Sequence, residues 1–403
     1  MGLWNKTGGA LHFAKLLSKK IVRGRKSALF LAWIMGIIFH QGGTVGAIMT
    51  STTVKPITDK YKVSHEELSY VVDSTASPIA TLIPFNAWPA YISGLIVGSI
   101  PIINDISDAN KYFLSSIPFN FYAIVAVFFS LLFSLGFLPI KIFSKKMYNA
   151  KKRSVKTGQL DDIKAMPLLL LEKSNKIADN YKPSLYDFFI PIGVILLVTI
   201  IPFISWQLNI IEEEKSNWIK EAFMLSTISS MIVAKIRGMS TKDIVDGFFQ
   251  GCQSMTIGAI VLGLAITLGL VAWKLNTANY LIHLISSSLS LFFLPSILTI
   301  LCMIVAFSTG TAFGTYAVVF PIAIPLAFSI NPDPLYIKIC FGAVLGGTVF
   351  GDQCSPISDT TIVSSMFTGC DLMDHVKTQF PFAFIASIIS ILLSTLCIFF
   401  ISS

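Results

Sequence analysis

Two aspartates, Asp352 and Asp359, lie seven residues apart in an otherwise apolar stretch, with a Ser-Pro pair between them. Pro356 has no backbone N–H and its ring clashes with the preceding turn, so a helix through this stretch must break and leave carbonyls without partners. Carbonyl, hydroxyl and carboxylate oxygens are ligands that Na⁺ prefers, and a carboxylate can exchange a proton for a cation because both compete for its charge. The segment therefore predicts an ion-binding site made by Asp352, Ser355, Ser358, Asp359, Thr360 and Thr361. The simpler interpretation is a Pro-kinked helix with hydroxyl caps, whose aspartates face water.

A second group of the same kind lies in the first half of the chain. Asp73 is followed by three hydroxyl residues, Ser74, Thr75 and Ser77, and then by a proline. Acids embedded in a membrane are costly and usually serve a function, so we expect this group to join the site. Its simpler interpretation is a helix cap or an interfacial acid, because other charged residues are close by. The carboxylates that would hold Na⁺ are those of Asp73, Asp352 and Asp359.

Polar residues also interrupt two other apolar stretches, 28–53 and 295–329. The interruption leaves legs that are short for a membrane crossing, which is typical of re-entrant hairpins. The residues predicted at the two tips are His40, Gln41 and Thr44, and then Ser308, Thr309 and Thr311. A polar tip that reaches the middle of the membrane would meet the broken helices. His40 would act there on a proton or substrate, or would serve only as a structural hydrogen-bond partner.

The elements that must position these residues are membrane helices. Hydrophobic residues make up 54% of the 403 residues and charged residues only 13%, about half the ~25% of soluble domains. Several runs without any charged residue exceed the ~20 residues that cross a bilayer. The runs without a charged residue are 28–54, 74–104, 117–140, 188–211, 255–273, 275–332 and 380–403. The chain is therefore predicted to be an all-α, polytopic protein of the cell membrane.

Composition and motifs exclude several other classes of protein. The positive charge lies in loops between apolar runs, where it reports topology rather than a nucleic-acid partner. The six cysteines form no C-x-x-C pair, and no G-x-x-x-x-G-K-[ST], H-E-x-x-H or G-x-S-x-G motif occurs. We therefore expect no cofactor, no ATP-driven step and no enzymatic activity.

The two halves of the chain echo one another. Phe39 to Gly46 matches Phe307 to Gly314 at one Phe and two Gly with identical spacing, and Ser-Pro-Ile recurs at 77–79 and 355–357. Two short surface helices, 7–26 and 276–291, correspond loosely through Trp, Thr and His. Repeated matches in the same order indicate an internal repeat, which is typical of secondary transporters.

Charge indicates how the repeats are oriented. Suppose that the first hairpin enters and leaves the membrane on the cytoplasmic side and the second on the outer side. Then 25 of the 30 Lys and Arg residues lie inside, and the N-terminus is cytoplasmic. The inside segments are then 1–27, 51–67, 141–187, 235–250 and 371–379. A full crossing by either hairpin would move basic loops outside, so the charge pattern favours two oppositely inserted hairpins in inverted structural repeats.

The repeats divide the chain into three parts. Residues 1–140 form the first repeat, 141–187 a basic cytoplasmic linker attracted to anionic lipid, and 188–403 the second repeat. Each repeat is expected to hold a re-entrant hairpin and a broken transmembrane helix. The broken helices are predicted at 68–103 and 335–370, and the unbroken spans at 117–140, 188–205, 219–234, 254–273 and 380–402.

At these residues the sequence resembles the NhaC-type Na⁺/H⁺ antiporter family. The resemblance is carried by GDQCSPISDTTIVSS at 351–365, by VKPITDKYKVSHEELSYVVDSTASPIATLIPFNAWPAYI at 54–92 and by GIIFHQGGTVG at 36–46. It covers nearly the whole chain. The resemblance implies paired re-entrant hairpins and broken helices, with 73–78 and 352–361 lining the cation and substrate site.

Two departures from the family pattern bear on function and length. Many members have F-x-D-D-Y at the first hairpin tip, where this chain has Phe39-His40-Gln41-Gly42-Gly43. Because this chain lacks the acidic pair, an anionic organic substrate is an alternative to simple Na⁺/H⁺ exchange. The second repeat has three spans before its surface helix and the first has none before Trp4. We expect from this comparison that about three N-terminal scaffold helices are missing.

The sequence thus predicts a secondary active antiporter whose partners are Na⁺, H⁺ and membrane lipid. The leading hypothesis is Na⁺/H⁺ exchange by alternating access between the repeats. An alternative is Na⁺- or H⁺-coupled exchange of small carboxylates such as malate and lactate, or of amino acids. An ion channel is a third hypothesis, although a filter usually needs symmetric copies around one pore. A homodimer is left open.

Overall fold

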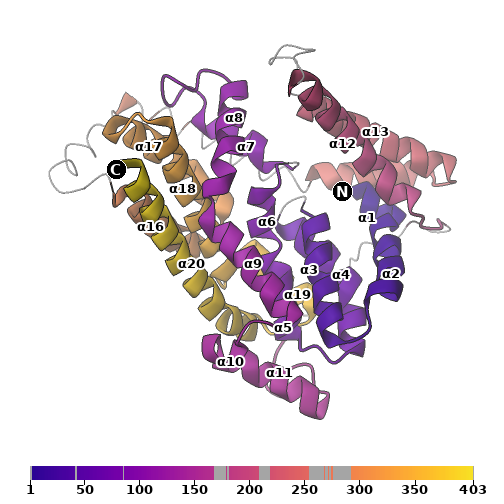
Figure 1. Cartoon of the computed structure of the whole chain (residues 1–403). Helices are drawn as coiled ribbons and strands as arrows, with labels where there is room; N and C mark the ends of the chain where they lie inside the picture. The colour runs from indigo at the N-terminus through magenta and orange to yellow at the C-terminus, as the bar shows by residue number, and fades with distance from the viewer. Residues whose placement is uncertain are drawn as a thin grey trace. The chain divides into compact units, whose positions relative to one another are not determined.

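The computed structural model covers the whole chain and describes residues 2–40, 43–84, 86–167, 178, 181–207, 218–253, 267, 271, 274–275 and 292–402. Within these ranges the chain forms helices and no strands, which confirms the all-α prediction (Figure 1). The predicted surface segment 276–291 and the tip residue Gln41 lie outside the described residues, as does the predicted span 254–273 apart from isolated positions.

The chain divides into two compact units. The smaller unit consists of residues Met1–Lys20 and Leu171–Ile257, and the larger unit consists of Ile21–Leu170 and Gly258–Ser403. The helices of the smaller unit are α1 (Gly2–Thr7), α2 (Gly9–Ile21), α12 (Tyr186–Gln207) and α13 (Ile219–Ile236). Within it, α1 packs against both α12 and α13.

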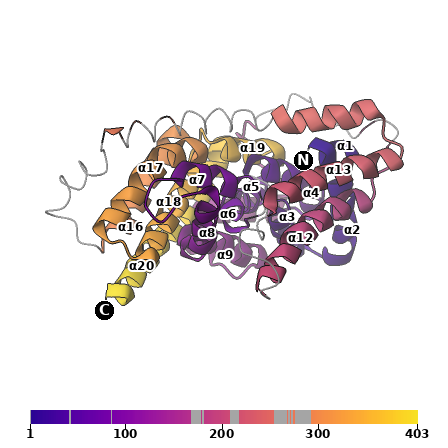
Figure 2. The ribbon, with the colours of Figure 1, turned by 90° about the horizontal axis from the view of Figure 1, so that it is seen from above.

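The larger unit holds every predicted site residue that the structure describes. Its helices are α3 (Arg25–Ile38), α4 (Gly43–Lys60), α5 (His65–Ser74), α6 (Ser77–Leu82), α7 (Trp88–Ile96), α8 (Ile106–Ser116), η1 (Ile117–Phe119), α9 (Phe121–Leu135), α10 (Ile140–Phe143), α11 (Lys145–Thr157), α16 (Leu294–Thr309), α17 (Ala312–Ile330), α18 (Pro334–Cys354), α19 (Asp359–Thr368) and α20 (Leu372–Ser402). In both views α16, α17 and α18 lie toward one end of this unit and α3 and α4 toward the other (Figure 1, Figure 2). Helices α5, α6 and α9 lie between them.

Among the described residues, three helices are long and apolar enough to cross a membrane unaided: α17, α18 and α20 up to Phe400. A fourth crossing is possible if the bent pair formed by α8 with η1 and by α9 counts as one span. The sequence predicts an unbroken span over 117–140, and this prediction is wrong. Pro118 opens the short helix η1 and the Asn120 side chain caps α9, and the chain bends by 50° between these two helices. Gly136, in a left-handed conformation, then ends α9.

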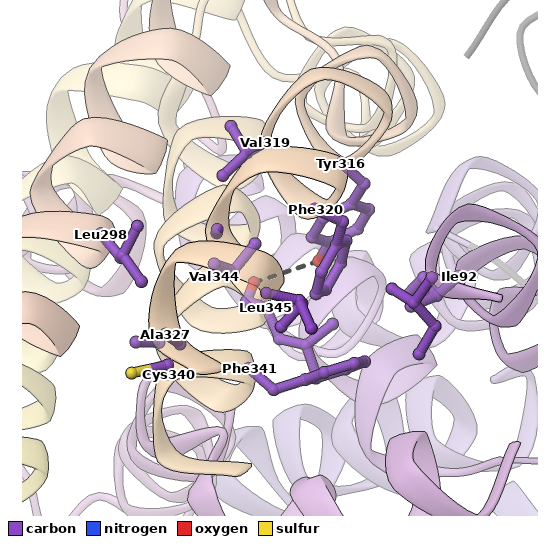
Figure 3. Close-up of a cluster of buried hydrophobic side chains, with 14 of the residues drawn as sticks. Ile92, Leu298, Tyr316, Val319, Phe320, Ala327, Cys340, Phe341, Val344 and Leu345 are labelled. Carbon is purple, nitrogen blue, oxygen red and sulfur yellow. Dashed lines mark hydrogen bonds between the residues drawn. The ribbon is translucent and has the colours of Figure 1, made fainter. Parts of the chain in front are cut away.

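Helix α18 forms the centre of the larger unit. All its residues from Ile339 to Cys354 are buried, and it packs against α16, α17, α20 and α9. Figure 3 shows the apolar cluster on its flank, where Phe341, Val344 and Leu345 of α18 meet Tyr316 and Phe320 of α17. The hydroxyl of Tyr316 donates to the backbone oxygen of Leu345 at 3.1 Å, which satisfies its only polar group in the cluster.

Glycines bring α18 into backbone contact on two faces. A Cβ at Gly342 would lie 2.3 Å from the Phe119 carbonyl oxygen, beside the bend that precedes α9. A Cβ at Gly347 would lie 2.4 Å from the Thr299 carbonyl oxygen, and one at Gly351 would lie 2.4 Å from the Cβ of Ala306, both on α16. Small residues four apart let membrane helices approach closely, so the glycine spacing explains how α16 and α18 pack together.

The first break separates α5 from α6. Helix α5 begins at a capping box, in which Ser64 and Glu67 satisfy each other's backbone N–H groups. It ends at Ser74, and α6 begins at Ser77 with Pro78 in its first turn. The Thr75 hydroxyl donates to the Val71 carbonyl at 2.8 Å, which satisfies a backbone group at the end of α5, and its role in the site stays a prediction. The break lies where the sequence predicts it.

Two helix pairs occupy the predicted hairpins, α3 with α4 and α16 with α17. Gly310, at a φ of +67°, forms the turn between α16 and α17. Helix α17 has 19 residues and can cross a membrane by length, in contrast to the short leg expected for a re-entrant hairpin. The re-entrant path therefore stays a prediction.

A cluster of charged groups fixes the start of α5. Arg153 of α11 donates to Glu66 at 2.8 Å, and Arg25 of α3 pairs with Glu67. The ring of His65 bridges Asp161 at 2.7 Å and Asp59 at 3.2 Å. These contacts join α3, α4, α11 and the segment after α11 to the helix that carries Asp73.

The ion pairs of His65 predict how stability changes with pH. Burial alone would lower the pKa of His65, but the hydrogen bonds and negative charges of Asp161 and Asp59 outweigh it and raise that pKa from 6.5 to about 9. The folded state therefore gains stability that is fully present below about pH 6.5 and is lost as the pH rises through about 9. We expect the melting temperatures of the unmodified protein and of His65→Gln to differ most near pH 6 and to converge above pH 9. A difference in melting temperature that stays constant from pH 6 to pH 9 would contradict the raised pKa of His65.

Candidate functional site

The second break lies between α18 and α19. Because Pro356 has no N–H, the carbonyl of Asp352 cannot form its helical hydrogen bond. The Thr361 hydroxyl lies 3.1 Å from this carbonyl oxygen and 3.0 Å from that of Gln353. Ser358 caps α19 by accepting from the Thr360 N–H. The freed carbonyls predicted from the sequence are thus present, and α19 turns back to meet them.

The Asp352 carboxylate lies at the meeting point of the two breaks. Its Oδ2 accepts from the Ser77 hydroxyl of α6 at 2.5 Å, and its Oδ1 accepts from the Ser358 hydroxyl at 2.9 Å. The Asp352 side chain is only 2% exposed, and no Lys, Arg or His pairs with it in the described part of the chain. A buried carboxylate held by neutral hydroxyls keeps a charge available for a proton or a cation.

Asp359 lies in a different environment. It is exposed, and its Oδ2 accepts from the Thr44 hydroxyl at the start of α4 at 2.7 Å. The neighbouring Gly43 is so close to the breaks that a Cβ would lie 2.6 Å from Thr360 and 2.9 Å from the Ser77 hydroxyl. The first hairpin tip therefore contacts both breaks, as the sequence predicts.

Asp73 is fully buried on the other side of Thr361. Its Oδ2 accepts from the Thr361 hydroxyl at 3.3 Å, from Gln379 at 2.7 Å and from the ring of His375 at 3.1 Å. The sequence reasoning missed His375 and Gln379, because it placed 371–379 in a loop. Their spacing of four residues at the start of an apolar run is the signal that could have revealed a polar helix face.

An amide joins the two broken helices. Gln353 donates to the Ser74 hydroxyl of α5 at 2.8 Å and accepts from the Tyr122 hydroxyl of α9 at 2.7 Å. Ser74, predicted to be a site residue, therefore binds the end of α18. Gln353 lies within the range 352–361 that the resemblance assigns to the site, and Tyr122 is a further residue that the sequence reasoning missed. These two hydrogen bonds join α5 and α9 to the last turn of α18.

Other predicted residues satisfy backbone groups. The hydroxyl of Ser355 donates to the Phe307 carbonyl at 2.7 Å, and that of Thr309 donates to the Val305 carbonyl at 2.8 Å. Thr311 caps α17, while Ser308 is exposed at the end of α16. The second tip still reaches the break, because a Cβ at Gly310 would lie 2.6 Å from the Ile357 carbonyl oxygen.

His40 is linked to the first break through Asn86. Its Nδ1 lies 3.1 Å from the Ile37 carbonyl oxygen, and its own carbonyl accepts from Asn86 at 3.3 Å. Asn86 also donates to the carbonyl of Ala80 in α6 at 2.7 Å. These bonds fit the structural interpretation of His40, and a role on a proton or substrate stays a prediction.

The three aspartates are near one another in the fold without forming one cluster. Among the described residues, no three His, Cys, Asp or Glu side chains gather as the ligands of one metal ion. Hydroxyls bond to Asp352 and Asp359, and a hydroxyl, an amide and the His375 ring bond to Asp73.

Comparison with known proteins gives one matching family model and three informative relatives. A model of the Na⁺/H⁺ antiporter family matches residues 79–397. An uncharacterized protein of Haemophilus influenzae is 29% identical over 394 residues, which cover 94% of this chain and 72% of that protein. The malate-2H⁺/Na⁺-lactate antiporter of Bacillus subtilis is 30% identical over 223 residues, covering 53% of this chain and 43% of the relative. The Na⁺/H⁺ antiporter NhaC of Alkalihalophilus pseudofirmus is 34% identical over 134 residues, which cover 33% of this chain and 27% of that protein.

Proposed function

The chain belongs to the Na⁺/H⁺ antiporter family, and from this premise we propose that it exchanges Na⁺ for H⁺ by alternating access. The antiporter family and the apolar helices make it an integral membrane protein. The cell membrane, a cytoplasmic N-terminus and lipid contacts of the basic linker are parts of the proposal.

One observation carries the proposal: Asp352 is buried where the two helix breaks meet, and only Ser77 and Ser358 hydrogen-bond to its carboxylate within the described residues. A proton on this carboxylate and a cation beside it both remove its charge, so each displaces the other. Such competition makes release of one ion a condition for binding the other, which is the requirement for exchange.

The proposal includes the arrangement of the repeats. Residues 1–140 and 188–403 would be inverted repeats joined by the linker 141–187, each with a re-entrant hairpin. Contact of both hairpin tips with the α18–α19 break, through Thr44 and Gly310, supports this arrangement. Opening one tip at a time would give the site access to one side of the membrane at a time.

Exchange of small carboxylates or amino acids coupled to Na⁺ or H⁺ is the second candidate function. It is favoured by the match to the malate-2H⁺/Na⁺-lactate antiporter, which covers more of this chain than the match to NhaC. The hydroxyls of α19 and the exposed Asp359 are suitable for a cation accompanied by a polar solute.

Proteoliposomes that carry a pH gradient test the proposal. We expect Na⁺ to collapse the gradient, read by a pH-sensitive dye, and an equal concentration of K⁺ to leave it. Collapse that requires Na⁺ together with malate or lactate would support the second candidate. A gradient that persists with every ion and solute would contradict both.

A further inference from the structure

The start of α20 carries two polar side chains that face Asp73. His375 and Gln379 are one helical turn apart, and both are fully buried. The ring of His375 lies 3.1 Å from Asp73 Oδ2, and the Gln379 amide donates to the same oxygen at 2.7 Å. With the Thr361 hydroxyl at 3.3 Å, three groups from two helices converge on one carboxylate oxygen.

The second oxygen of the same carboxylate has no partner. Asp73 Oδ1 is buried and forms no hydrogen bond to the described residues. An unpartnered, buried carboxylate oxygen is costly unless a ligand completes it. Because three groups hold Oδ2, the carboxylate cannot rotate to satisfy Oδ1 without losing hydrogen bonds to Oδ2.

Gln379 also connects Asp73 to the second break. The same amide nitrogen donates to the carbonyl of Gln353, one of the two that the α18–α19 break frees. One side chain of α20 therefore sets the position of a carboxylate from α5 and a carbonyl from α18. Both are oxygen atoms of the type that binds Na⁺.

We propose that His375 and Gln379 are positioning residues that hold Asp73 so that its Oδ1 binds the transported cation. The inference rests on the proposed function and adds α20 as an element that sets cation affinity. His375 acts as a hydrogen-bond donor in this role. Partners that orient a metal ligand typically change affinity by about 10- to 100-fold when they are removed.

The variants His375→Leu and Gln379→Met remove the donors and keep side chains of similar size. We expect each to raise the apparent KM for Na⁺ by about 10- to 100-fold, with the maximal rate within about threefold. His375→Gln keeps a donor and should restore most of the affinity. The matched control is Thr378→Val, because among the described residues this hydroxyl bonds only to the carbonyls of Asp374 and His375 in its own helix.

Two readouts separate this proposal from the proposed function. The first is the KM for Na⁺ in proteoliposomes, and the second is the rise in melting temperature of the purified protein on adding Na⁺, which needs no transport. The proposal is supported if His375→Leu and Gln379→Met lose the rise in melting temperature on adding Na⁺ but melt normally without Na⁺. This result supports positioning even if Na⁺/H⁺ exchange is not found. An unchanged KM and an unchanged rise in both variants overturn it.

The pH profile identifies a different role for His375. A positioning residue leaves the pH dependence of exchange unchanged in His375→Gln, because the glutamine only donates a hydrogen bond. If His375→Gln binds Na⁺ normally but loses pH-dependent exchange, the ring carries the proton and the proposal is overturned. No Na⁺-dependent rise in the unmodified protein would overturn it as well.

Discussion

Replacing Asp352 with asparagine is expected to abolish exchange and to leave membrane insertion intact. The amide has the same shape, and its oxygen can accept from Ser77 or Ser358 as the carboxylate does. It has no charge for Na⁺ and H⁺ to compete for, so neither ion can displace the other. Exchange measured by dye in proteoliposomes should fall to that of empty vesicles, while the yield and the elution profile of the purified protein stay unchanged.

The same helix supplies a matched control. Asp333 lies at the opposite end of α18 and caps it, since its side chain accepts from the Leu335 N–H at 3.0 Å. Asparagine caps helices as well as aspartate does, so Asp333→Asn should exchange ions normally. If Asp352→Asn retained exchange with an unaltered pH profile, the coupling charge would have to be that of another site carboxylate, Asp359 or Asp73.

The second large effect concerns the folded state. A side chain at Gly351 has no space, because its Cβ would lie 2.4 Å from the Cβ of Ala306 and 2.5 Å from the Phe307 nitrogen. Backbone cannot move aside as a flexible side chain can, and overpacking of this kind typically costs about 1–3 kcal/mol or more. We expect Gly351→Val to lower the melting temperature in detergent by several degrees and to reduce the yield of folded protein.

Gly193 of α12 provides the comparison for this variant. A Cβ there would meet nothing within 4 Å, so Gly193→Val adds the same atoms without a steric conflict. Its melting temperature should stay close to that of the unmodified protein. Equal losses in the two variants would indicate that valine itself, rather than the contact between α16 and α18, lowers stability.

Local chemistry made both breaks predictable. Pro356 removes a donor from α18 whatever surrounds it, and the Ser-Pro pair at 77–78 marks the start of α6 in the same way. The contact between Asp352 and Ser358 spans six residues, so it too follows from the turn. The contact with Ser77 spans 275 residues and was expected only because both segments looked alike.

The residues that sequence reasoning missed owe their position to tertiary packing. Asp371, Asp374 and Lys377 make the start of α20 look like a loop, yet the Asp371 side chain caps the helix by accepting from the Asp374 N–H. His375 and Gln379 acquire their role only when α5 lies beside this turn. At the start of α20, charged residues made a helix look like a loop. At Asn120 the absence of charged residues made a bent segment look like one unbroken span.

The glycine contacts of α18 also determine where this part of the molecule can bend. Side chains that interdigitate can slide by changing rotamers, but two backbones in contact lack that freedom. Helix α18 is therefore clamped between α16 and the corner before α9, and it acts as a stiff lever with Asp352 in its last turn. We expect a displacement of α16 to carry that carboxylate with it, and bending to occur in the four residues from Ser355 to Ser358, which connect α18 to α19.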